Sequence, residues 1–136
     1  MIGPFPEPVS GVSLANQVVQ GILSENSYFD VDFINTSYSK FDEQLGQFTF
    51  KKFFFYLSQN FKLVKIFSNK ILYITPGQTF YGILKYALFI ILGSILKKQL
   101  IIHVHGNYLK QEYNSLRRLK RVVFYFLLLH TYWFSL

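Results

Sequence analysis

The chain has 136 residues, a net charge of +7 and no cysteine, and 51% of its residues are hydrophobic and 20% aromatic. This length corresponds to about one domain of roughly 100–200 residues. The absence of cysteine excludes disulfides, cysteine-ligated zinc and thiol catalysis. The high content of apolar and aromatic residues excludes an intrinsically disordered chain.

The charge is distributed unevenly. Residues 1–61 carry three lysines against six acidic residues, a net charge of −3, whereas residues 62–136 carry eleven basic residues against Glu112 alone, a net charge of +10. A strongly basic half indicates an anionic partner, such as a membrane surface, a nucleic acid or a phosphorylated substrate. A solvated basic face that keeps the protein in solution is the alternative.

In the acidic half, residues 1–3 are expected to end a strand, and the proline-rich segment 4–8 to form a rigid loop. Apolar residues at helical spacing predict a helix over 11–25, with Ser10 or Ser13 as its cap. The alternation of Phe29, Val31 and Phe33 with acidic residues predicts a strand over 28–36. A polar loop is expected over 37–46 and an aromatic helix over 47–61.

In the basic half, short apolar runs predict strands over 70–75 and 100–105, closed by Pro76-Gly77 and Gly106-Asn107. Longer apolar stretches predict helices over 79–98 and over 115 to about 130. The longest uncharged stretches, 86–96 and 122–136, are each shorter than the ~20 consecutive apolar residues of a transmembrane helix. We therefore expect buried or surface-lying helices, with an integral membrane protein as the alternative.

Strands that alternate with helices indicate an α/β protein with a Rossmann-like parallel sheet and helices on both faces. We expect one such domain over residues 1–136. Ligands of these sheets bind beyond the carboxyl ends of the strands. The loops after the strands are therefore the candidate binding segments.

Gly11 is expected where the first strand leads into the first helix. Free amides and the positive end of the helix dipole suit a phosphate there, and glycine lets it approach the backbone. The loop matches neither G-x-x-x-x-G-K-[ST] nor G-x-G-x-x-G. A simple tight turn explains the same residues without a ligand.

His103 and His105 lie two residues apart on the fourth predicted strand, so both point to the same face. A metal pair would need a third ligand, for which only His130 or distant carboxylates are available, and we expect no metal site. His105, at the end of the strand, is suited to orient or polarise a ligand hydroxyl. A buried histidine bonded to the backbone is the alternative and suits His103 better.

Four basic residues, Arg117, Arg118, Lys120 and Arg121, accompany apolar residues in the last predicted helix. This pattern is typical of a helix that lies on an anionic membrane surface. The aromatic residues belong to apolar helices rather than to a sheet face that would stack bases. No nucleic-acid-binding module is recognisable, so we expect no nucleic acid as partner.

The sequence resembles the retaining glycosyltransferases of family four, whose two Rossmann-like domains form the GT-B fold. The opening GPFPEPVSGVSLANQ is similar to their first motif, FINTS to the end of their second strand, and IIHVHGNY to a fourth strand that ends in His-x-His-Gly. The resemblance covers almost the whole chain, as the N-terminal, acceptor-side domain.

The resemblance implies roles for particular residues. Gly11 and Val12 would contact the diphosphate of a nucleotide-sugar donor, and His105 would lie near the transferred sugar as the catalytic residue. Asn107, Pro8 and Ser10 would bind the acceptor, a glycan or a lipid-linked glycan. No cofactor other than the donor substrate is implied. The enzyme would be cytoplasmic and peripheral at the inner face of the membrane, with Arg117, Arg118, Lys120 and Arg121 on the membrane surface.

The donor-binding domain of that family carries two glutamates in the pattern E-x7-E, which this chain lacks. The first strand is short, and the terminal HTYWFSL stops where the next strand is expected to begin. The sequence therefore predicts a truncated acceptor-side domain that is inactive alone. The alternatives are a small membrane-associated protein without enzymatic activity and a phosphate-binding module of another α/β class.

Overall fold

The computed structural model describes residues 1–37, 60–129 and 132–135. The chain divides into two compact units, Met1–Lys62 and Leu63–Leu136. The predicted loop over 37–46 and most of the predicted helix over 47–61 lie outside the described residues.

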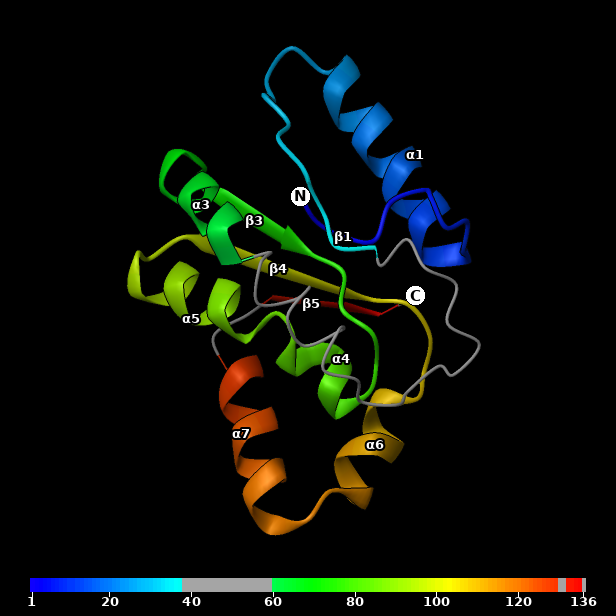
Figure 1. Cartoon of the computed structure of the whole chain (residues 1–136), viewed down its shortest axis with the longest axis vertical. Helices are drawn as coiled ribbons and strands as arrows, with labels where there is room; N and C mark the ends of the chain where they lie inside the picture. Colours follow the sequence, from blue (N-terminus) through cyan, green and yellow to red (C-terminus); the bar gives the residue numbers. More distant parts are fainter. Residues whose placement is uncertain (38–59, 130–131, 136) are drawn as a thin grey trace. The chain divides into compact units, whose positions relative to one another are not determined.

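The N-terminal unit contains two short parallel strands and the helix between them (Figure 1). They are β1 (Ile2–Gly3), α1 (Gly11–Glu25) and β2 (Ile34–Asn35), with Ile2 paired to Ile34. Ile2, Phe5 and Ile34 are buried. The strand and helix predicted at the start of the chain are therefore confirmed.

The strand predicted over 28–36 is wrong in its extent, because only Ile34 and Asn35 pair with β1. A strand can pair only along the length of its neighbour, and β1 has two residues. Phe29 and Phe33, two apolar residues of the alternating pattern, are 46% and 44% exposed. Among the described residues, 28–33 pair with no strand, so the alternating pattern does not form the predicted strand there.

Helix α1 buries polar residues and exposes apolar ones. Ser13 and Asn16 are buried, and the Asn16 side-chain amide donates to the Pro4 carbonyl at 2.8 Å. Val18 and Ile22, part of the predicted apolar face, are 60% and 64% exposed. Carbonyls of the loop before the helix accept hydrogen bonds from Ser13 and Asn16, so the polar side of α1 packs against this loop.

The C-terminal unit is built on three parallel strands in the order β3-β4-β5 (Figure 1). The strands are β3 (Ile71–Ile74), β4 (Gln99–Val104) and β5 (Tyr132–Ser135). Before them lie the 3-10 helix η1 (Asn60–Val64), which spans the boundary of the units, and the short helix α3 (Lys65–Ser68). The strands predicted over 70–75 and 100–105 are confirmed.

Strand β5 was not predicted. The sequence was expected to end before a further strand could form. Its last residues nevertheless pair in parallel with β4, from Ile101↔Tyr132 to Val104↔Ser135. Aromatic residues are favoured in strands, and the neighbouring strand supplies the hydrogen-bonding groups that this short segment needs.

The single helix predicted over 79–98 is wrong. The segment forms α4 (Phe80–Leu84) and α5 (Ala87–Ile95), separated at Lys85 and Tyr86. The Tyr86 ring is 1% exposed, and Lys85 Nζ lies 4.8 Å from its centroid. Burial of this aromatic ring favours a change of direction over a continuous helix.

The helix predicted from Ser115 to about 130 is confirmed as one helix, but it begins at Arg118 rather than Ser115. Helix α6 (Leu109–Ser115) was not predicted, and α7 (Arg118–Leu128) follows after the extended residues Leu116 and Arg117. Helix α6 buries none of its residues, so it has no apolar periodicity from which to predict it. Helix α7 packs on α4, α5 and α6 through Phe124 and Leu127, both buried.

The α/β class with parallel strands is confirmed, and the structure is consistent with an incomplete Rossmann-like fold. In the C-terminal unit, Ile74, Ile102 and Val104 are at most 1% exposed. Within the ranges that the structure describes, no helix is both long enough and apolar enough to cross a membrane.

Candidate functional site

Two histidines mark the carboxyl end of β4. His103 lies within the strand and is buried, and His105 follows the strand and is half-buried. Their ring centroids are 4.2 Å apart with an interplanar angle of 31°. The prediction that both side chains lie on one face is confirmed.

The partner of His103 comes from the neighbouring strand. The Tyr73 hydroxyl is hydrogen-bonded to His103 Nδ1, and the two rings meet edge to face. Burial raises the pKa of Tyr73, so the phenol stays protonated, and the tautomer of the imidazole decides which of the two groups donates. Burial, and secondly the nearby His105, lower the pKa of His103 and favour its neutral form.

Gln78 braces the loop that follows β4. Its side-chain amide donates to the His105 carbonyl at 2.6 Å, and its side-chain oxygen accepts from the Tyr108 amide. Gly106 between them has φ +106°, and a Cβ at this position would lie 2.5 Å from Gln78 Nε2. Glycine is therefore required both by the backbone conformation and by the close approach of Gln78.

The Nε2 atoms of both histidines are buried and have no hydrogen-bond partner in the described part of the chain. Unsatisfied buried polar atoms are few in native proteins and are explained by a water, an ion or a functional role. Two of them at the carboxyl end of one parallel strand, where ligands of such sheets bind, make this the candidate functional site.

His130, considered above as a third metal ligand, lies outside the described residues. Over residues 1–37, 60–129 and 132–135, no group of three His, Cys, Asp or Glu side chains could hold a metal ion. The two imidazoles supply two nitrogens, and the third group near them is the Tyr73 hydroxyl.

The predicted phosphate-binding residues begin α1 in the N-terminal unit. Gly11 is exposed and Val12 half-buried, and as the first two helical residues their amides have no intrahelical acceptor. A Cβ on Gly11 would meet no atom within 4 Å. Packing within the described part of the chain therefore does not require glycine at this position.

Two predicted acceptor-binding residues have structural roles. The Ser10 hydroxyl accepts from the Ser13 amide at 3.1 Å, and the Ser10 amide donates to the Ser13 hydroxyl at 2.7 Å, which forms a capping box. The Pro8 carbonyl accepts from the Ser13 hydroxyl at 3.1 Å. These contacts account for both residues without a ligand.

Asn107, the third predicted acceptor-binding residue, is exposed in the loop between β4 and α6. It lies two residues beyond His105 in the C-terminal unit, whereas Gly11, Val12, Ser10 and Pro8 belong to the N-terminal unit. The structure thus groups His105 with His103 and Tyr73, and Gly11 with Val12.

The four predicted membrane-surface residues differ in their contacts. Lys120 Nζ donates to the Tyr81 hydroxyl at 3.2 Å, and Arg121 donates to the carbonyls of Asn114 and Leu116 at 3.0 and 3.2 Å. Arg117 and Arg118 are exposed at the start of α7. Lys120 and Arg121 therefore also hold α7 to the rest of its unit.

Tyr73 and Gln78 were not predicted as site residues. Both come from the segment of β3 and the loop after it, about 30 residues before the histidines. The parallel pairing of β3 with β4 brings Tyr73 opposite Ile101 and thereby near His103. The signal that could have identified them is their place at the carboxyl end of the adjacent strand.

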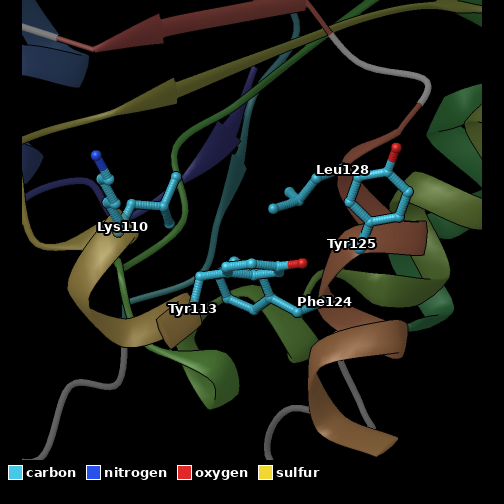
Figure 2. Close-up of a pocket in the computed structure, with 6 residues that line it drawn as sticks. Lys110, Tyr113, Phe124, Tyr125 and Leu128 are labelled. Atoms are coloured by element: carbon cyan, nitrogen blue, oxygen red, sulfur yellow. The ribbon is translucent and has the colours of Figure 1, made fainter. Parts of the chain in front are cut away.

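Two hollows of the C-terminal unit lie between α6 and α7, and neither histidine lines them (Figure 2). Lys110 and Tyr113 project from α6, and Phe124, Tyr125 and Leu128 from α7, around a cavity of about 240 Å³. An adjoining cavity of about 290 Å³ shares Tyr113 and Tyr125 with the first. Its other lining residues are Leu116, Arg118, Arg121 and Val122. We call the two cavities together the α6–α7 groove.

In comparisons with known proteins, no family model, no curated protein and no solved structure matched this chain.

Proposed function

We propose that the chain is the acceptor-side domain of a glycosyltransferase. The reaction would transfer a sugar from a nucleotide-sugar donor to a glycan or lipid-linked acceptor. The observation that carries the proposal is the pair of adjacent rings of His103 and His105 at the carboxyl end of β4, each with an Nε2 that has no partner among the described residues. The parallel α/β fold supports it, because such sheets bind ligands at this edge.

His105 is the residue to which we assign contact with the reacting groups. An imidazole at the end of a strand can accept a hydroxyl proton or donate to a sugar oxygen. The hydrogen bond from Gln78 to the His105 carbonyl fixes the backbone at His105, and the adjacent His103 ring restricts the position of the imidazole. His103 is a positioning residue, because its own Nδ1 is bonded to Tyr73.

Gly11 and Val12 are the residues to which we assign the donor phosphates. Their position at the start of a 15-residue helix supports the assignment, because helix N-termini stabilise anions through amides and the helix dipole. The open space over Gly11 is consistent with a group that approaches the backbone closely.

A ligand-observed saturation-transfer NMR titration with UDP-glucose and GDP-mannose tests the donor contact. Gly11→Trp would fill the space over the helix amides and is expected to abolish the transfer of saturation to the bound nucleotide sugar. Gly21→Trp is the matched control, since Gly21 is an exposed glycine of the same helix with no atom within 4 Å of its Cβ position. Equal signals from the two variants, or none from the unmodified chain, would contradict the assignment of Gly11.

A further inference from the structure

Helix α7 is apolar on two opposite faces. Phe124 and Leu127, on its inner face, are 2% and 3% exposed. Its outer face carries a second set at helical spacing, which we call the outer stripe. The stripe consists of Leu119, Val122, Phe126 and Leu129, which are 78%, 60%, 58% and 51% exposed. Exposed apolar residues that gather on one face indicate an interaction surface.

Arginines lie beside the outer stripe. Arg118 precedes Val122 by four residues and so lies next to it on the helix, and Arg118 and Arg121 line the α6–α7 groove together with Val122. The segment 109–129 holds five basic residues and one acid. That acid, Glu112, accepts the Phe80 amide at 2.8 Å. The surface near the stripe is therefore cationic.

Helix α1 provides a comparison within the same chain. Leu14, Val18 and Ile22 also form an exposed apolar set, with Val18 as exposed as Val122 at 60%. Helix α1 has no basic residue and ends in Glu25. The two helices therefore expose apolar side chains alike and differ in charge.

We propose that α7 lies in the interface of an anionic bilayer. The outer stripe enters the acyl-chain region, and Arg118 and Arg121 meet lipid phosphates. An amphipathic helix with basic residues beside an apolar face binds in this way, and each basic residue adds to the attraction of an anionic leaflet. Charge complementarity favours a bilayer over a second copy of the chain, because two copies of this face would bring their arginines together. The inference is independent of the proposed sugar transfer.

The absence of cysteine permits a direct test. Val122→Cys and Val18→Cys, in separate full-length chains, are labelled with an environment-sensitive fluorophore and mixed with vesicles. Vesicles of phosphatidylcholine with phosphatidylglycerol are expected to shift the emission of the label at 122 to shorter wavelength, and to leave the label at 18 unchanged. Vesicles of phosphatidylcholine alone are expected to give little shift at either position, and added salt to reverse the shift at 122.

Unlabelled variants measure the affinity by co-sedimentation with the anionic vesicles. Val122→Asp is expected to lower the partition coefficient about tenfold or more, because a valine inserted among the acyl chains is replaced by a charge. Arg118→Gln is expected to lower it about fivefold, and Val18→Asp to leave it unchanged. Far-UV circular dichroism verifies that each variant is folded.

Three results would overturn the proposal. Equal shifts at 122 and 18 would indicate adsorption through exposed apolar residues in general. Equal binding to neutral and anionic vesicles would remove the role of the arginines. A shift at 122 that depends on protein concentration without vesicles would assign the stripe to a second copy of the chain.

Discussion

At the residue scale, the properties of the site depend on neighbours that are distant in sequence. His103 and His105 were predicted to share a face from their spacing alone. The contacts of the Tyr73 hydroxyl and the Gln78 amide, about 30 residues earlier, were not predicted. Their contacts depend on the register of β3 against β4, which is set by packing and is not visible in either strand by itself.

The ionisation of His103 predicts how stability depends on pH. Burial, and secondly His105, hold the pKa of His103 below its ordinary value of 6.5 in the folded chain, whereas the unfolded chain titrates near that value. Between the two values the unfolded chain binds more protons, so the free energy of unfolding rises with pH. The stability contributed by neutral His103 is therefore complete above about pH 6.5 and declines as the pH falls below it.

Urea denaturation between pH 5 and pH 8 measures this effect. His103→Gln is expected to reduce the loss of stability on acidification relative to the unmodified chain. If the variant lost as much stability between these pH values as the unmodified chain, the acid sensitivity would belong to another group.

At the element scale, helices were predicted best where local signals are complete. The bounds of α1 agree with the prediction because Ser10 caps the helix through its own side chain. Helices α4 and α5 were predicted as one because a continuous apolar stretch does not indicate that Tyr86 turns into the core. Helix α6 was missed because its contacts, such as Glu112 with the Phe80 amide, are made to another element.

Close packing at the start of α4 gives a prediction for Gly82. A Cβ on this residue would lie 2.8 Å from the Gly77 carbonyl oxygen and 2.9 Å from its carbon. Gly82→Ala is therefore expected to destabilise the chain by about 1–3 kcal/mol through overpacking, less up to about 1 kcal/mol from the better helix propensity of alanine.

Gly21→Ala is the matched variant on α1, where the Cβ meets nothing within 4 Å. It is expected to stabilise the chain by up to about 1 kcal/mol. Thermal unfolding followed by circular dichroism compares the two substitutions. Equal effects would show that the turn before α4 accommodates a methyl group without strain.

At the scale of the whole molecule, composition and the order of elements predicted the α/β class, which needs no atomic detail. The high hydrophobicity was less informative, because it did not reveal which apolar side chains are buried. Val18 of α1 and Val122 of α7 are both 60% exposed, and both belong to stretches that periodicity alone would place in a core. Tertiary packing therefore determines which of these apolar side chains are buried and which are exposed.

The basic residues of the C-terminal half differ in their contacts. The excess of basic residues after residue 61 was predicted to attract an anionic partner. Lys120 and Arg121 also hydrogen-bond to residues of their own unit, whereas Arg118 lies beside exposed apolar residues of α7. The charge count could not make this distinction, because it depends on how α7 packs.

The proposed sugar transfer is tested most directly at the histidine rings. The chain has three histidines, so their imidazole signals can be resolved by two-dimensional proton–carbon NMR and assigned with His105→Gln and His103→Gln. UDP-glucose at millimolar concentration is expected to move the His105 signal in a saturable way, and uridine diphosphate without the sugar to leave it in place. An unmoved His105 signal with UDP-glucose, or an equal displacement with uridine diphosphate, would contradict the assignment of His105 to the transferred sugar.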